Sequence, residues 1–367
     1  MLPEMRYIEG ELLPMLRERA HKHEKSARRQ LSQWKGERGV CSLLLHVTDA
    51  PEIQRLPEYN NEEIHYDVEK MFVSQLRLAL TSALADGDAV PSVRANVGCG
   101  ALCTLYGGLK QTFFEDKMPW LLQHLTSEQL MELTPESIEE SPEFKMGLEQ
   151  MRFMKEMLRG TGIEVYPMDL QGPIDMAHLL LGNEFFYLLY DEPEIIHHAL
   201  ELSVAADAYG MKKSFEIIQP GDWVCHYNEL VLPAETPLKI SEDTSTLLCG
   251  EHLIEYMKPY TERLLTEFGG GYIHYCGDNK HLLQLTPHLK NSIGMNFGNP
   301  ERHDPAAVLR ELGGLHKCYY GRFADMTPVE QAQLARQENG WFNTMIPFYC
   351  RMEDQARVIE EFHEALK

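Results

Sequence analysis

The chain of 367 residues carries a formal net charge of −22, with 44% hydrophobic and 25% charged residues. Its length suits one large domain or two modest ones, and its negative charge disfavours nucleic acid and anionic membranes as general partners. No apolar run reaches the roughly 18 residues of a membrane span, and Met1–Arg19 lacks the compact apolar segment of a signal peptide. We therefore expect a cytoplasmic protein.

The first part of the chain, to about residue 84, has mainly helical periodicity. Apolar residues recur at helical spacing from Ile64 to Ala83, and Gly87 and Pro91 end this pattern. The run Cys41–Val47 reads either as a further strand or as an edge feature. The pattern predicts an N-terminal helical extension over residues 1–85, which could also cover a second subunit in a homo-oligomer.

From residue 86 onward, short apolar runs alternate with helical stripes, which indicates parallel strands joined by crossover helices. Seven or eight such units fit a closed barrel better than an open sheet. Residues 86–367 are therefore predicted to form a (β/α)8 barrel of the TIM type, in an α/β protein whose reactive groups gather where strands end and βα loops begin. The predicted strands are Ser92–Val97, Ile163–Met168, Trp223–Tyr227, Tyr272–Cys276, Ser292–Phe297, Lys317–Tyr320 and Thr344–Cys350.

The most informative candidate site is the pair His274 and Cys276. Residues two apart on a strand point to the same face, and Gly277 then permits a sharp turn. An imidazole and a thiolate are suitable ligands for a borderline-soft ion such as zinc. A third ligand must come from elsewhere: Cys350 closes another strand-like run, and Cys318 competes with it. Equally, the pair could simply fill the barrel interior.

Other polar residues lie at predicted strand ends and are candidates for the substrate site. Each is equally well explained as a structural hydrogen-bonding group, because buried polar groups need partners. Gly98 and Cys99, in a turn of small residues, and Gln171 are candidates for contact with a bound cofactor. The candidate catalytic residues are Asp169, His226, Asp243 and Asn296.

From about Pro91 to the C-terminus, the sequence resembles the uroporphyrinogen decarboxylase superfamily. The resemblance is carried by Asp169–Ala177 with its Gly-Pro turn, by Asp191–Glu194, and by the unit from Ile240 to Tyr260. Within that superfamily, a His-x-Cys-Gly segment followed by a distant cysteine resembles the corrinoid-dependent methyltransferases, such as methylcobalamin:coenzyme M methyltransferase.

This resemblance implies a zinc ion bound by His274, Cys276 and Cys350, with an open position where a substrate thiol loses its proton. It also implies a corrinoid, methylcobalamin, supplied by a partner protein, since the chain has no Asp-x-His-x-x-Gly signature of its own. Asn296 stands where these methyltransferases often place an acidic ligand. The fourth ligand is therefore open between Asn296, Glu301 and water.

The sequence thus predicts a zinc-dependent methyltransferase that moves a methyl group between a corrinoid and a thiol or another small methylated substrate. A decarboxylase-like lyase acting on a tetrapyrrole is the second hypothesis, although the Arg-x-x-Gly-Arg motif of the decarboxylases is missing from this sequence. A barrel that binds a corrinoid or tetrapyrrole without catalysis is the third.

Overall fold

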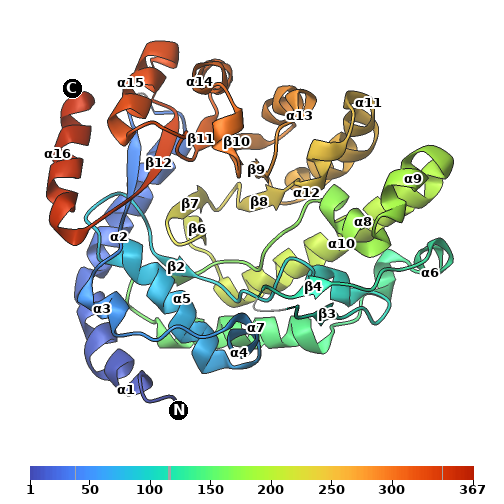
Figure 1. The fold of residues 1–367 in the computed structure, drawn as a ribbon, viewed down its shortest axis with the longest axis horizontal. Helices are drawn as coiled ribbons and strands as arrows, with labels where there is room; N and C mark the ends of the chain where they lie inside the picture. Colours follow the sequence, from blue (N-terminus) through green and yellow to red (C-terminus); the bar gives the residue numbers. More distant parts are fainter. Residues whose placement is uncertain (38, 115–116, 341) are drawn as a thin grey trace.

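The computed structural model describes residues 1–37, 39–114, 117–340 and 342–367, and it is an α/β fold built on a parallel sheet (Figure 1). The strands are β1 (Ser42–Val47), β2 (Ser92–Val93), β3 (Gln111–Thr112), β4 (Trp120–Leu121), β5 (Glu164–Val165), β6 (Trp223–His226), β7 (Leu230–Pro233), β8 (Leu238–Ser241), β9 (Gly271–Tyr275), β10 (Ser292–Phe297), β11 (Cys318–Tyr320) and β12 (Thr344–Cys350). Six of them form one sheet in the order β1-β12-β11-β10-β9-β8. The other three pairs are β2 with β5, which are parallel, and β3 with β4 and β6 with β7, which are antiparallel.

Helices lie outside this sheet, and α12 to α15 cover its outer side in Figure 1. The α-helices are α1 (Met5–Tyr7), α2 (Leu13–Trp34), α3 (Pro51–Gln54), α4 (Asn61–Tyr66), α5 (Val68–Ala83), α6 (Ser127–Met131), α7 (Pro142–Met157), α8 (Pro173–Leu181), α9 (Glu184–Asp191), α10 (Pro193–Ile218), α11 (Gly250–His252), α12 (Lys258–Glu267), α13 (Lys280–Leu285), α14 (Pro305–Gly314), α15 (Pro328–Asn339) and α16 (Gln355–Ala365). Within the described ranges, no helix combines the length and apolar character needed to cross a membrane.

Local sequence signals explain where several helices begin and end. The Asp67 side chain accepts hydrogen bonds from the backbone N–H groups of Glu69 and Lys70 at the start of α5, which satisfies donors that the helix itself cannot pair. Thr327 and Glu330 form a reciprocal capping box at the start of α15, and Gly340 ends that helix in the left-handed conformation. Capping residues therefore set these helix boundaries.

Most predicted strands are confirmed. Ser292–Phe297 and Thr344–Cys350 appear with the predicted bounds, whereas Ser92–Val97 shortens to two residues. The prediction of a parallel strand at Trp223–Tyr227 is wrong, because β6 pairs with β7 as an antiparallel hairpin. The parallel strand in this part of the sheet is β8 (Leu238–Ser241), which periodicity alone did not indicate.

The N-terminal region is continuous with the sheet. β1 lies within residues 1–85 and pairs in parallel, along its own whole length, with Met345–Cys350 of β12, so Cys41–Val47 contains a sheet strand. Trp34, at the end of α2, stacks on Tyr272 of β9 with ring centroids 6.2 Å apart, and its Nε1–H donates to the Val231 carbonyl oxygen at 2.6 Å. The predicted boundary at residue 85 therefore does not coincide with a break in the core.

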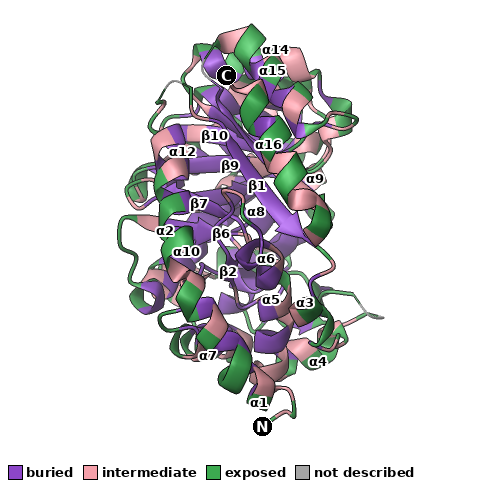
Figure 2. Ribbon diagram, turned by 90° about the vertical axis from the view of Figure 1, so that its left-hand side faces the viewer, coloured by how far each residue is buried: buried purple, intermediate pink, exposed green. Residues whose placement is uncertain are grey.

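The inner face of the sheet carries both an apolar core and the polar candidates. Tyr272 of β9 and Met345 of β12 pack around Trp34 in one buried cluster, and Figure 2 shows the strands as the buried centre of the molecule. Ile273 and Ile346, the next residues along β9 and β12, join the cluster on the helix side. Strand alternation therefore places His274 and Cys276 on the inner face, beyond the apolar core.

Candidate metal centre

Three side chains converge at the C-terminal ends of β8 and β9. They are Asp243, His274 and Cys276, and one ligand atom from each lies within 4.8 Å of the other two. The Cys276 Sγ lies 3.4 Å from the His274 Nε2, and the Asp243 Oδ1 lies 3.8 Å from the same nitrogen. A nitrogen, a sulfur and an oxygen thus face one point, and the Asp243 side chain is 43% exposed, so the site is open to solvent.

The register of the two strands explains this convergence. Ser241 of β8 pairs with His274 of β9, so the residues that follow each strand, Asp243 and Cys276, also become neighbours. The Cys276 N–H donates to the Asp243 Oδ1 at 2.6 Å. The carboxylate of Asp175, in α8, holds the segment that follows β8. It accepts hydrogen bonds from the backbone N–H groups of Asp243, at 2.9 Å, and Thr244, at 2.6 Å.

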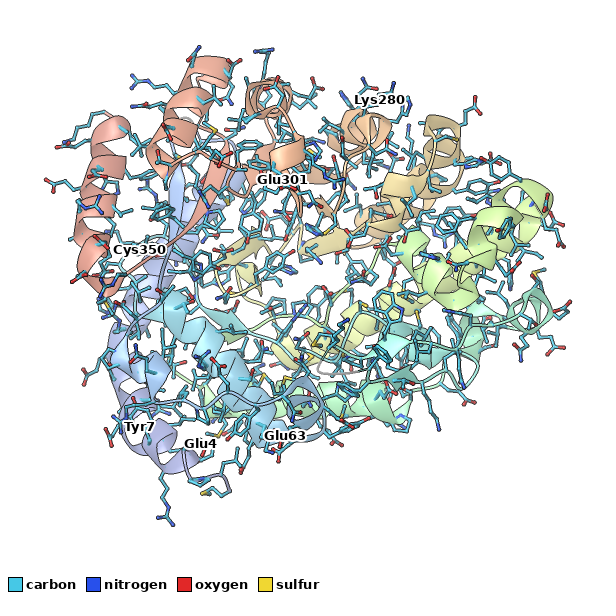
Figure 3. All side chains as sticks on the ribbon, viewed as in Figure 1. Glu4, Tyr7, Glu63, Lys280, Glu301 and Cys350 are labelled. Atoms are coloured by element: carbon cyan, nitrogen blue, oxygen red, sulfur yellow. The ribbon has the colours of Figure 1, made fainter. Side chains whose placement is uncertain are left out.

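Cys350 is not part of this cluster, which corrects the predicted third ligand. Its neighbour in the strand, Tyr349, stacks on the buried His46 ring with the ring centroids 4.6 Å apart. Alternation then turns Cys350 to the opposite side, where it packs on the helix-side core and lines a groove between α15 and α16. Figure 3 shows Cys350 at the edge of the molecule beside α16.

Cys318 and Glu301 also lie away from this cluster. Cys318 begins β11, so it sits at the opposite end of the sheet, where its Sγ contacts the Gln33 carbonyl oxygen at 3.5 Å. Glu301 is exposed and accepts a hydrogen bond from the Asn299 Nδ2 at 2.9 Å. Neither reaches the ligand atoms of Asp243, His274 and Cys276. The third ligand available to the His274–Cys276 pair is therefore the Asp243 carboxylate.

The protonation state of His274 favours metal binding, whereas that of Cys276 opposes it. Burial, together with the nearby Lys239 cation, lowers the pKa of His274, so its imidazole is neutral at pH 7. Burial and the Asp243 carboxylate raise the pKa of the Cys276 thiol to about 11. A metal ion would have to displace the thiol proton, so metal affinity should rise with pH.

The spacing of the ligand atoms matches that of tetrahedral zinc. Zinc bonds of about 2.0 Å to nitrogen and about 2.3 Å to sulfur separate the two ligand atoms by roughly 3.5 Å, close to the 3.4 Å between the His274 Nε2 and the Cys276 Sγ. Gly298, after β10, leaves space for this sulfur: a Cβ there would overlap the Cys276 Sγ and lie 3.2 Å from its Cβ. The three side chains fit a zinc ion and leave one coordination position open.

Replacing Gly298 with alanine should therefore weaken metal binding. The added methyl group would push the Cys276 sulfur from its position, and we expect the affinity for Co²⁺ to fall by roughly tenfold or more. Competition with a chromophoric chelator measures this affinity. Gly10→Ala is the matched control, since nothing lies within 4 Å of a Cβ at that position. Equal cobalt affinity in both variants would contradict the role given to Gly298.

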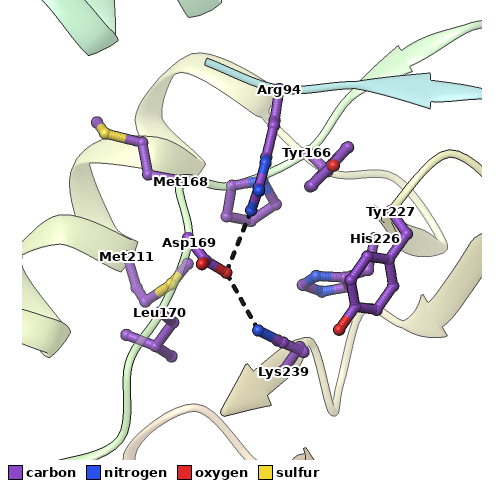
Figure 4. Close-up of a pocket in the computed structure, with 10 residues that line it drawn as sticks. Arg94, Tyr166, Met168, Asp169, Leu170, Met211, His226, Tyr227 and Lys239 are labelled. Carbon is purple, nitrogen blue, oxygen red and sulfur yellow. Dashed lines mark hydrogen bonds and ion pairs between the residues drawn. The ribbon is translucent and has the colours of Figure 1, made fainter. Parts of the chain in front are cut away.

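Arg94, Asp169 and Lys239 form a charged network (Figure 4), and Lys239 and Asp169 are close enough to His274 to influence its charge. The Asp169 Oδ1 is 3.2 Å from the Arg94 guanidinium and 3.1 Å from the Lys239 Nζ, and the Gln171 Nε2 donates to the Asp169 Oδ2 at 3.0 Å. Burial alone would raise the pKa of Asp169, but Lys239 and Arg94 outweigh it and hold that pKa well below its usual range. Asp169 is thus a fixed carboxylate, unsuited to be a general acid at neutral pH.

His226 lies beside this network and away from the metal ligands. It lines a narrow cavity together with Arg94, Asp169 and Lys239. Its Nε2–H donates to the Pro237 carbonyl oxygen at 2.7 Å, and burial lowers its pKa to about 4. The structure therefore places His226 as a neutral, hydrogen-bonded ring, and its proposed catalytic role stays a prediction.

The segment with Gly98 and Cys99 faces the same acidic groups. Burial, followed by the negative charges of Asp169, Asp175 and Asp243, raises the pKa of Cys99 to about 12. Gly98 has φ +89°, and a Cβ there would lie 2.6 Å from the Gln111 Oε1, so this turn requires glycine. The thiol of Cys99 borders the centre without joining its ligand set.

Two features of the site were missed at the level of sequence. Lys239 stands between Leu238 and Ile240 in β8, and this alternation is the signal that could have revealed an inward-pointing lysine. The buried pair of His46 and Glu229 joins β1 to the β6–β7 turn, with 2.6 Å between the His46 Nε2 and the Glu229 Oε2. No local pattern connects residues so distant in sequence.

Comparison with known proteins adds no further constraint. No model of a protein family matches the sequence, and no curated protein matches it either. The geometry of Asp243, His274 and Cys276 is therefore the structural basis for what is proposed below.

Proposed function

We propose that this protein is a zinc-dependent methyltransferase that moves a methyl group between a corrinoid and a small thiol. The observation that carries the proposal is the convergence of Asp243, His274 and Cys276 on one point at the ends of adjacent parallel strands. This set replaces the expected third cysteine with a carboxylate. Zinc accepts such mixed nitrogen, sulfur and oxygen ligands.

We further infer that the strands form a complete (β/α)8 barrel around this centre. The described hydrogen-bond ladders give a six-stranded sheet and a separate β2–β5 pair. Two contacts link the segments around this pair to the two edges of the sheet: a bridge between Gln171 and Ser241 of β8, and the hydrogen bond from the Asp88 N–H to the Leu43 carbonyl oxygen of β1 at 2.7 Å. Closure would place the candidate site at the barrel mouth, where TIM-type enzymes bind substrates.

The residues at the ends of β8 and β9 and the neighbouring charged residues would have different roles. His274, Cys276 and Asp243 would hold the ion and leave one position open towards solvent. Asp169, paired with Arg94 and Lys239, would remain ionised and would balance the positive charges of these two side chains beside the site. Zinc, when bound, would supply the Lewis acidity that makes a thiolate available at neutral pH.

The partners follow from what this chemistry requires. The corrinoid, when bound, would supply the methyl group, and the small thiol would supply the sulfur that accepts it, with the thiol proton released to solvent through the open side of the site. The corrinoid would arrive on a partner protein, consistent with a chain that lacks the corrinoid-binding signature. A small thiol, or another small methylated compound in the reverse direction, would be the second substrate.

Metal analysis combined with a methyl-transfer assay tests the proposal. Protein purified without chelators should contain about one zinc ion per chain, and it should transfer the methyl group of methylcobalamin to a small thiol such as 2-mercaptoethanol. Removal of zinc with a chelator should stop the reaction, and zinc should restore it. Methylcobalamin bound without turnover would indicate a carrier instead, and decarboxylation of a porphyrinogen by metal-free protein would indicate a lyase.

A further inference from the structure

Asn296 of β10 connects the candidate metal centre to the neighbouring strand β11. Its Oδ1 hydrogen-bonds to the His274 Nδ1, and its Nδ2 donates to the Tyr320 carbonyl oxygen at 2.9 Å. Asn296 is buried, with 9% of its surface exposed, so both polar atoms of its amide are used within the protein. These contacts bear on whether Asn296 can also serve as the fourth metal ligand.

The Tyr320 carbonyl decides how this amide is oriented. A backbone carbonyl oxygen only accepts hydrogen bonds, so the NH₂ of Asn296 must face it, and the Asn296 oxygen must face His274. The His274 Nδ1 must then carry the proton and donate to that oxygen. A neutral imidazole protonated on Nδ1 has its lone pair on Nε2, which is the nitrogen that faces Cys276 and Asp243.

Tyr320 is itself held by a buried network on the other side. Its hydroxyl group donates to the Glu229 Oε1, and the Glu229 Oε2 lies 2.6 Å from the His46 Nε2. The His46 Nδ1 in turn contacts the Thr81 Oγ1 at 2.8 Å, and that hydroxyl donates to the Leu78 carbonyl oxygen at 2.7 Å. Every member of this network is thus paired, and the pairing of Tyr320 with Met345 in the β11–β12 ladder holds the Tyr320 backbone.

We propose that Asn296 is a positioning residue that holds His274 in the Nδ1–H form, with the Tyr320–Glu229–His46 network as its support, and that it is not a metal ligand. This inference rests on the metal-binding part of the proposed function. Ligand histidines commonly donate their second N–H to such an acceptor, and loss of that acceptor typically costs 10- to 100-fold in metal affinity. The fourth position then remains open for the substrate.

Asn296→Leu tests the proposal, because leucine has a similar size but no hydrogen-bonding atom. The His274 tautomer is measured in metal-free and in zinc-loaded protein from ¹⁵N chemical shifts of histidine-labelled samples. The affinity for Co²⁺ is measured by adding cobalt to the metal-free protein. The His274 signal is assigned by its loss in His274→Gln. We expect the Nδ1–H form in the wild type, a mixture of tautomers in Asn296→Leu, and a loss of cobalt affinity of roughly 10- to 100-fold.

Two further variants keep the test decisive. Asn299→Leu changes an amide that donates to the exposed Glu301, so it should leave both measurements at the wild-type value. Asn296→Asp retains an oxygen that accepts a hydrogen bond from the His274 Nδ1, so we expect it to keep the Nδ1–H form. This variant provides a second test if Asn296→Leu does not fold.

The outcomes separate the two proposals. If the wild type binds neither cobalt nor zinc while Asn296→Leu still loses the Nδ1–H form, the metal-dependent function is wrong and the positioning role stands. If the wild type binds metal and Asn296→Leu keeps both the tautomer and the affinity within about twofold, the positioning role is wrong, because the loss of a hydrogen-bond acceptor behind a ligand histidine normally has a much larger effect.

Discussion

Cys276→Ser should yield protein that retains less than about a tenth of the wild-type zinc content and loses methyl transfer. The serine hydroxyl stays protonated at neutral pH and is a poor zinc ligand, and His274 and Asp243 alone provide only two donor atoms. Zinc content after dialysis, measured by mass spectrometry, and the rate with methylcobalamin check this expectation. Unchanged far-ultraviolet circular dichroism would show that the variant still folds.

Cys350→Ser is the matched control for that experiment. The resemblance to corrinoid-dependent methyltransferases implied that Cys350 is the third ligand, whereas the structure places it in the groove between α15 and α16. We therefore expect Cys350→Ser to keep its zinc, and Asp243→Asn to lose most of it, because the amide oxygen is a much weaker donor than a carboxylate. Loss of zinc from Cys350→Ser with retention in Asp243→Asn would reverse this assignment.

Asp207→Asn should become increasingly more stable than the wild type as the pH rises. Asp207 lies in the middle of α10 with its side chain fully buried, and neither of its oxygens has a hydrogen-bond partner among the described residues. Burial, and then the nearby carboxylates of Glu242 and Asp175, raise its pKa well above the ordinary value. The folded protein therefore keeps this carboxyl group protonated, and the unfolded chain does not.

The sign of the effect follows from proton counting. From about pH 5, where the unfolded-state carboxyl group is ionised, up to the raised folded-state pKa of Asp207, the folded state binds one more proton at this group than the unfolded state. The free energy of unfolding therefore falls by roughly 1.4 kcal/mol per pH unit from this group. Asparagine removes this contribution. Asp175, with a pKa raised to about 7, and Glu242, with a pKa raised to about 8, act in the same direction in both proteins, so the difference between the two proteins isolates Asp207.

Urea denaturation of both proteins over this pH range measures the difference. Asp191→Asn, at the exposed end of α9, is the control and should give a curve parallel to that of the wild type. A parallel curve for Asp207→Asn as well would mean that the Asp207 carboxyl group is ionised in the folded protein, which would contradict the stability argument.

The sequence by itself determined most of the local strands and helices, and it identified His274 and Cys276 as neighbours in the candidate metal site. The short apolar runs Ser292–Phe297 and Thr344–Cys350 favour strands through residues that are close together in the chain, so these strands appear where they were predicted. The same short-range reasoning placed His274 and Cys276 on one face, because strand alternation needs no knowledge of the rest of the fold.

Only the tertiary structure decided which residues join that pair. The register of β8 against β9 brings Asp243 to Cys276, and the alternation of β12 turns Cys350 away. Alternation shows which residues share a face, but the register between strands decides which face is turned inward, and a shift of one residue would exchange the two faces. The Asn296–Tyr320 contact and the His46–Glu229 pair likewise join segments brought together by the fold, because their hydrogen bonds form only once the strands have packed.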